Sequence, residues 1–89
     1  MSLVSKFEKI AEEVRKLTSP ATDEEKLALY GLYKQANFGD ISTDPPNPSE
    51  SIVGRAKWEA WNSRKGMSQD EAMAEYVVYA QKMIDKYKV

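Results

Sequence analysis

Residues 37–50 form the stretch that most constrains the fold of this 89-residue chain. The stretch is built from Gly39, three prolines and mainly Asp, Asn, Ser and Thr, which cannot sustain a long helix. Loops of this length are uncommon inside compact domains unless they cover a site or cross the fold. A crossing loop allows the helices before and after it to run parallel. We therefore expect an overhand loop between the second and third helices of an all-α fold.

Before this stretch, apolar residues recur three and four positions apart and predict two helices. The first covers residues 2–17 and ends at the Thr-Ser-Pro sequence of residues 18–20. The second covers residues 23–36 and opens with a capping box made by Thr22 and Glu25. Gly31 lies inside this helix at a cost of about 1 kcal/mol relative to alanine, and the local sequence gives no reason for it.

After the stretch, two further helices are expected. A short one is capped by Ser49 or Ser51 and continues to about residue 63, and Gly66 supplies left-handed backbone at its C-terminal end. Ser68 and Glu71 repeat the capping box and begin a helix that continues to the chain end. No strand pattern or internal repeat is present, so residues 1–89 are expected to form a single small domain.

Composition excludes several classes of function. The chain contains no cysteine and no histidine, which removes disulfides, thiolate metal sites and the commonest general base. A net charge of −1 lacks the cationic excess of a protein that follows a nucleic-acid backbone. No apolar run approaches the roughly 20 residues that cross a bilayer, and no secretory leader is recognisable. We therefore expect an intracellular, soluble protein whose anionic ligand is compact.

Two short segments carry the strongest functional signal, because each places aromatic residues and a lysine at helical spacing. Tyr30, Tyr33 and Lys34 occupy one helix face at i, i+3 and i+4. Lys57 directly precedes Trp58 in the second segment. Tyrosines can simply fill the core of a small bundle, but a core alone would not require two lysines. We interpret the segments as a site for an anion attached to a flat ring.

The two indoles have a simpler explanation. Trp58 and Trp61 lie three residues apart on one predicted helix, and in a small helical protein such pairs usually pack between helices. We expect Trp61 above all to lie in the core. The acidic residues that follow Thr22 are likewise explained by helix capping, so no catalytic group is indicated.

The stretches YGLYKQANFGDI, AKWEAWN and KGMSQDEAMAEY resemble the acyl-CoA-binding protein family, and the resemblance covers essentially the whole chain. It implies an up-down-down-up four-helix bundle. It also implies a cytoplasmic carrier that binds medium- to long-chain acyl-CoA esters without reacting with them, for transport and pool buffering. We expect a monomer, because four amphipathic helices can bury one another without leaving a spare hydrophobic seam. No metal, cofactor or catalytic residue is implied.

The resemblance also implies roles for individual residues. Tyr30, Lys34 and Lys57 would hold the 3′-phosphate of the ribose, and Tyr33 and Tyr76 would border the adenine and nucleotide. The route of the acyl chain and pantetheine would be lined by Phe7, Ala11, Arg15 and Leu27. Lys26 is a difference, because relatives commonly have an apolar residue there, near the ligand groove.

Two alternatives remain open at this stage. A helical protein-interaction domain would use its aromatic face to dock a partner, and it predicts a large exposed apolar patch. An acyl-CoA hydrolase or isomerase would need catalytic groups for which the sequence offers no candidates.

Overall fold

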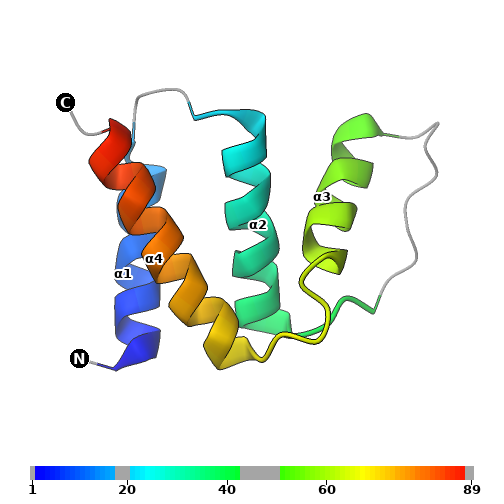
Figure 1. Cartoon of the computed structure of the whole chain (residues 1–89), viewed down its shortest axis with the longest axis horizontal. Coiled ribbons are helices and arrows are strands. Elements are labelled where there is room, and N and C mark those ends of the chain that lie inside the picture. The colour runs from blue at the N-terminus through cyan, green and yellow to red at the C-terminus, as the bar shows by residue number, and fades with distance from the viewer. Residues whose placement is uncertain (1, 18–20, 43–50, 88–89) are drawn as a thin grey trace.

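A computed structural model describes residues 2–17, 21–42 and 51–87, and in these ranges it contains four α-helices and no strand. They are α1 (Leu3–Arg15), α2 (Asp23–Phe38), α3 (Ile52–Asn62) and α4 (Gln69–Tyr87). In Figure 1, α1 and α4 run upward while α2 and α3 run downward. The expected all-α, up-down-down-up bundle with parallel central helices is therefore confirmed. None of the helices in the described ranges is long and apolar enough to cross a bilayer.

Helices α2, α3 and α4 start at the expected capping residues, whereas α1 is capped by Ser2, which the sequence predicts to be its first helical residue. The hydroxyls of Ser2 and Ser51 accept hydrogen bonds from backbone N–H groups in the first turns of α1 and α3. Thr22 and Glu25 make both bonds of a capping box at the start of α2. Ser68 Oγ accepts a hydrogen bond from the Glu71 N–H, 3.0 Å away, at the start of α4. Each bond satisfies a backbone group that the helix itself leaves free.

The helix ends differ from expectation by a few residues. Helix α1 stops two residues early at Arg15, and α2 continues two residues further than expected to Phe38. Gly39 has φ 75° and donates its N–H to the Gln35 carbonyl, so the left-handed backbone that ends α2 is reached only there. Gly66 has φ 94° as predicted, but it lies in a turn after the α3 cap Ser63.

Four predictions concern residues outside the described ranges. They are the break at residues 18–20, the prolines Pro45, Pro46 and Pro48 of the loop, the alternative cap Ser49, and the continuation of α4 through residues 88–89.

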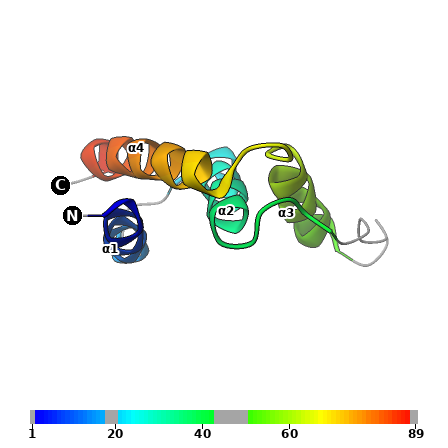
Figure 2. The same ribbon diagram turned by 90° about the horizontal axis from the view of Figure 1, so that it is seen from below.

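The core lies where α1, α2 and α4 meet. Helix α2 packs against both α3 and α4, and α1 packs against α4. The buried apolar side chains come from α1, α2 and α4, together with one residue after α2: Phe7, Ile10, Ala11, Leu29, Leu32, Ala36, Ile41, Ala72, Tyr76, Ala80 and Met83. Helix α3 contributes no buried residue and lies at the side of the bundle, beyond α2 (Figure 2).

The prediction that Trp61 lies in the core is wrong. Trp61 is only partly buried and packs at the interface of α2 and α3, where its ring centroid lies 6.1 Å from that of Phe38. Its indole N–H donates to the Gly39 carbonyl, 2.9 Å away. Because α3 packs on one side of α2 alone, none of its side chains reaches the core.

A buried amide fastens the turn after α3 to the end of α2. Gln35 is fully buried, and its Nε2 donates to Asp40 Oδ1 at 2.9 Å and to the Met67 carbonyl at 2.7 Å. Asp40 Oδ1 also accepts from the Gly66 N–H at 2.8 Å. The bonds from Gly66 and Gln35 favour the carboxylate, so they lower the pKa of Asp40.

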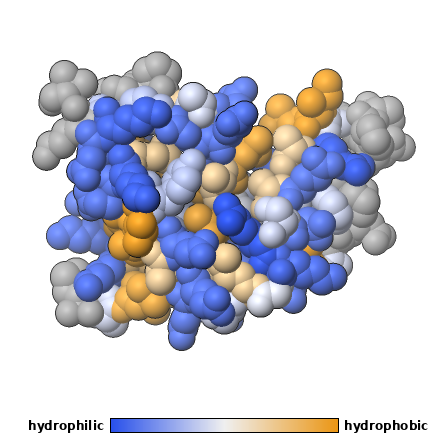
Figure 3. All heavy atoms as spheres, viewed as in Figure 1, coloured by the Kyte–Doolittle hydropathy of each residue, from blue (hydrophilic) through white to orange (hydrophobic). Residues whose placement is uncertain are grey.

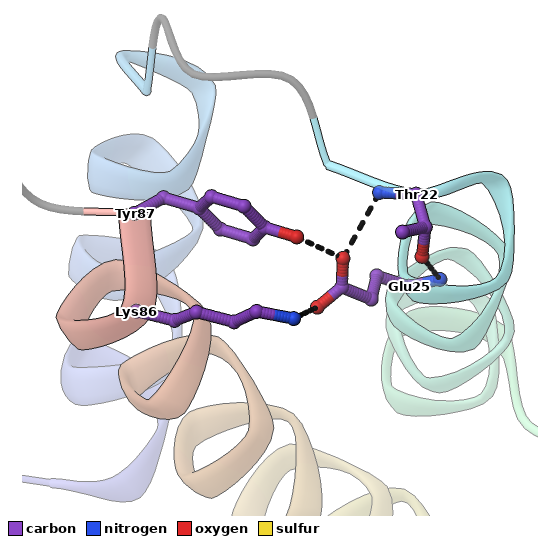
Figure 4. Close-up of polar contacts among 4 residues, drawn as sticks. All are labelled: Thr22, Glu25, Lys86 and Tyr87. Atoms are coloured by element: carbon purple, nitrogen blue, oxygen red, sulfur yellow. Dashed lines mark hydrogen bonds and ion pairs between the residues drawn. The ribbon is translucent and has the colours of Figure 1, made fainter.

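A carboxylate links the start of α2 to the end of α4 (Figure 4). Glu25 accepts hydrogen bonds from the Tyr87 hydroxyl, from the Thr22 N–H and from Lys86 Nζ. These bonds, led by that from Tyr87, lower the pKa of Glu25 from 4.5 to about 2. Glu25 therefore both caps the start of α2 and joins it to the last turn of α4.

Candidate functional site

Three rings from three different helices form an aromatic cluster beside the core. Phe7 of α1 stacks on Tyr33 of α2 with 5.6 Å between ring centroids, and it meets Tyr76 of α4 edge-on at 5.0 Å. Tyr33 and Tyr76 are 5.9 Å apart. Phe7 and Tyr76 are buried, so their rings are held in place by the core. We call Phe7, Tyr33 and Tyr76 the three-ring cluster.

Arg15 places a positive charge against this cluster. Its Nη2 donates to the Tyr33 hydroxyl at 3.3 Å, and its guanidinium carbon lies 6.0 Å from the Tyr33 ring centroid. Burial raises the pKa of Tyr76, and the nearby Arg15 charge only partly opposes this effect. The Tyr76 phenol is therefore neutral at physiological pH and does not repel an anion.

A hollow of about 270 Å³ adjoins the cluster between α1, α2 and α4. We call it the site hollow; its lining residues are Ala11, Val14, Arg15, Lys26, Leu29, Tyr30, Tyr33 and Tyr76. The lining combines apolar side chains with three phenols and two cations. Such a mixture suits a ligand that has both a flat or apolar part and a negative group.

Two lysines gather around Tyr30 at the edge of the site hollow. Lys57 Nζ of α3 lies 5.5 Å from the Tyr30 ring centroid, and Lys34 Nζ of α2 lies 5.8 Å from it. Both of the ion pairs found among the described residues, Arg55–Glu59 and Lys86–Glu25, lie elsewhere. The two ammonium groups thus face a phenol from two helices, and neither forms an ion pair with a carboxylate of residues 2–17, 21–42 or 51–87.

Gly31 explains how α3 comes close enough to bring Lys57 to this position. A Cβ atom at Gly31 would lie 2.4 Å from the Ala60 carbonyl oxygen and 2.9 Å from its carbon. Any larger residue would push the two helices apart. The helix-interior glycine that the sequence leaves unexplained is therefore required by the contact between α2 and α3.

The structure brings together eight of the nine predicted site residues. Five line the site hollow, Phe7 packs on two of them, and Lys34 and Lys57 lie beside Tyr30. Leu27 is the exception, since it lines a separate hollow of about 400 Å³ between α2 and α3. Leu27 precedes Tyr30 by three residues, which rotates it about 60° around α2 toward α3.

Several residues of this region were given no role from the sequence. Lys26, which the resemblance places near the ligand groove, lines the site hollow one helical turn before Tyr30. Its i, i+4 spacing from Tyr30 agrees with this position. Val14 and Leu29 complete the apolar wall of the hollow. Phe38 lies beside Lys34 although it is 65% exposed, and no sequence pattern marked it.

Another hollow of about 400 Å³ lies between α2 and α4. Arg64, Glu75 and Lys82 of its lining carry charges of both signs, and the remainder is mainly small or aliphatic. At the site hollow, by contrast, cations from α1, α2 and α3 converge on phenols. We therefore take the site hollow and the adjoining lysines as the candidate binding site.

Residues 4–80 match the family model described as acyl-CoA-binding protein. An acyl-CoA-binding protein of Brassica napus is 44% identical over 85 residues, which cover 96% of this chain and 91% of that protein.

Solved structures agree in fold over nearly the full length. The crystal structure of Oryza sativa acyl-CoA-binding protein 2 superposes with a TM-score of 0.92 at 37% identity, covering 98% of this chain and 94% of that one. The crystal structure of the acyl-CoA-binding protein from Moniliophthora perniciosa gives a TM-score of 0.87 at 33% identity, covering 100% of this chain and 86% of that one.

Proposed function

Because this chain belongs to the acyl-CoA-binding protein family, we propose that it binds medium- to long-chain fatty acyl-CoA esters as a non-catalytic carrier. The observation that carries the proposal is the convergence of Lys34 and Lys57 on Tyr30 beside the three-ring cluster. We further propose that residues 1–89 act as one domain, as a monomer in the cytoplasm, serving transport and buffering of the acyl-CoA pool.

In this proposal the phosphate is recognised by charge. Lys34, Lys57 and the Tyr30 hydroxyl donate hydrogen bonds to the 3′-phosphate of the CoA ribose, and bonds to ionised groups are stronger than neutral ones. Tyr33 and Tyr76 border the adenine, which gains from contact with an aromatic face. A ligand without the 3′-phosphate leaves both ammonium groups without this partner.

The acyl chain supplies the second part of the affinity. Phe7, Ala11 and Arg15 line its route, and we keep Leu27 in the proposal as a contact on the α3 side of α2. Each buried methylene contributes roughly 0.8 kcal/mol, so half-effective burial of a hexadecanoyl chain yields about 6 kcal/mol. That is close to half of what a nanomolar complex requires, so affinity should rise with acyl length.

A calorimetric titration with palmitoyl-CoA, CoA and palmitate tests the proposal. We expect tight one-to-one binding of palmitoyl-CoA and much weaker binding of CoA and palmitate, because each of the latter lacks one part of the ligand. Lys57→Ala should weaken the binding of palmitoyl-CoA, and Lys82→Ala on α4 is the matched control that should not. Equal affinity for acyl chains of all lengths would contradict the proposal.

The protein-interaction alternative predicts a large exposed apolar patch. On the face drawn in Figure 3, apolar areas are small and separated by hydrophilic ones. Ile52 and Val53 are exposed at the start of α3. The absence of saturable palmitoyl-CoA binding in the titration would favour this alternative. Hydrolysis of the bound thioester would instead favour an enzyme.

A further inference from the structure

The ammonium of Lys34 lies among three aromatic rings. Lys34 Nζ is 4.7 Å from the ring centroid of Phe38, 5.5 Å from that of Trp61 and 5.8 Å from that of Tyr30. Two of these rings come from α2 and one from α3. We call Tyr30, Phe38 and Trp61 the Lys34 cage.

The rings of the cage are themselves held in position. Trp61 donates its indole N–H to the Gly39 carbonyl at 2.9 Å, which fixes the indole against the end of α2. Phe38 is the last residue of α2, and its ring packs on Trp61 with 6.1 Å between centroids and 50° between planes. Phe38 is nonetheless 65% exposed, so burial in the core does not explain why an aromatic residue occupies this position.

An aromatic cage suits a lysine that must bind an anion. The face of a ring attracts an ammonium through its quadrupole, yet the ring brings no net negative charge. A carboxylate in the same place would neutralise the lysine and compete with a phosphate. Lysine side chains also lose much rotamer freedom on binding, and a side chain that is already held loses less.

We propose that Phe38 and Trp61 are positioning residues that hold the Lys34 ammonium beside Tyr30, so that Phe38 sets the preference for ligands that carry a 3′-phosphate. The proposal rests on the proposed function, because it assigns the phosphate to Lys34. It concerns selectivity between two ligands and extends the site to Phe38, which is not among the residues that line the site hollow.

The test compares palmitoyl-CoA with palmitoyl-dephospho-CoA, which lacks the 3′-phosphate. Phe38→Leu removes the aromatic face at an exposed position and leaves the buried core intact. An exposed cation–π contact corresponds to roughly a two- to fivefold change in affinity. We expect Phe38→Leu to weaken binding of palmitoyl-CoA by this factor and to leave the binding of palmitoyl-dephospho-CoA unchanged. Phe38→Tyr should restore the wild-type preference, and Val78→Ala, at an exposed position on α4, should not alter it.

Several results would overturn the proposal. An equal loss on both ligands would make Phe38 a direct contact to the part that the two ligands share. No loss on either ligand would make the ring dispensable. If the wild-type protein binds neither ligand, the proposed function itself fails. If it binds both ligands equally, acyl-CoA binding stands, but the assignment of the 3′-phosphate to Lys34 fails and the selectivity role of Phe38 fails with it.

A measurement without ligand tests the cage separately. Ring currents should shift the ε-methylene protons of Lys34 upfield in the NMR spectrum of the free protein. Phe38→Leu should reduce this shift, while the shift of Lys82, the control lysine on α4, stays constant. An unshifted Lys34 signal in the wild-type protein would refute the cage whatever the protein binds.

Discussion

Replacing Gly31 by alanine tests the close contact between α2 and α3, because the atoms nearest to the added methyl group would be backbone atoms of α3. The added Cβ would lie 2.4 Å from the Ala60 carbonyl oxygen, so α3 must move by about 1 Å to restore an ordinary contact of 3.4 Å. Alanine gains about 1 kcal/mol of helix propensity over glycine. Overpacking costs about 1–3 kcal/mol, so we expect the variant to lose roughly 0–2 kcal/mol of unfolding free energy.

Binding should be affected more than stability, because α3 carries Lys57 and Trp61 with it when it moves. Lys57 Nζ is 5.5 Å from the Tyr30 centroid in the intact protein, and the displacement weakens its reach to a phosphate held there. Hydrogen bonds to charged groups contribute about 1.5–3 kcal/mol, so weakening one of them should reduce the affinity for palmitoyl-CoA by about tenfold.

Urea unfolding and calorimetric titration with palmitoyl-CoA measure the two effects. Gly54→Ala is the matched control, because it makes the same change within α3, where the added Cβ meets only the Ser51 side chain, at 3.2 Å and beyond. We expect Gly54→Ala to keep its affinity. The reasoning would be refuted if Gly31→Ala were more stable than the wild type and bound the ligand equally well.

Three further predictions concern stability and ligand choice. The pKa of Glu25 is lowered from 4.5 to about 2, so its stabilising contribution is complete above about pH 4.5 and is lost as the pH falls toward 2. Urea unfolding between pH 2 and 6 should therefore show a flatter acid limb for Glu25→Gln, and an unchanged slope would contradict this assignment. Gln35→Leu removes the donor to Asp40 and Met67 and should cost about 1–3 kcal/mol in urea unfolding, whereas a loss below about 0.5 kcal/mol would show that the buried amide does not hold the turn. Calorimetry across acyl lengths from octanoyl- to palmitoyl-CoA should show affinity rising with each added pair of methylenes, and a plateau from the shortest chain would contradict burial of the tail.

Much of the fold can be predicted from the sequence because it depends on local chemistry. Thr22 and Glu25 lie three residues apart, and this spacing alone determines the capping box at the start of α2. The spacing of Tyr30, Tyr33 and Lys34 likewise places them near one another on α2 whatever surrounds the helix. These features need no knowledge of how the helices meet.

The remaining features depend on the approach of one helix to another, which no local pattern encodes. Gly31 has a role only because the Ala60 carbonyl lies against it, and Trp61 is outside the core only because α3 packs on one side of α2. Phe38 belongs to the Lys34 cage because α2 continues to Phe38, two residues beyond the predicted end. Leu27 lies about 60° around α2 from Tyr30. Whether this rotation turns Leu27 toward the site hollow or toward α3 can be decided only when the position of α3 is known.

The most direct test of the account is a thermodynamic cycle between Lys57 and the 3′-phosphate of the ligand. Calorimetry gives the affinities of wild type and Lys57→Ala for palmitoyl-CoA and for palmitoyl-dephospho-CoA. The account predicts a coupling free energy of at least about 1.5 kcal/mol, because the hydrogen bond between the lysine and the phosphate is lost when either partner is removed. Additive effects of the two changes would contradict it, since they would show that Lys57 does not bind the phosphate.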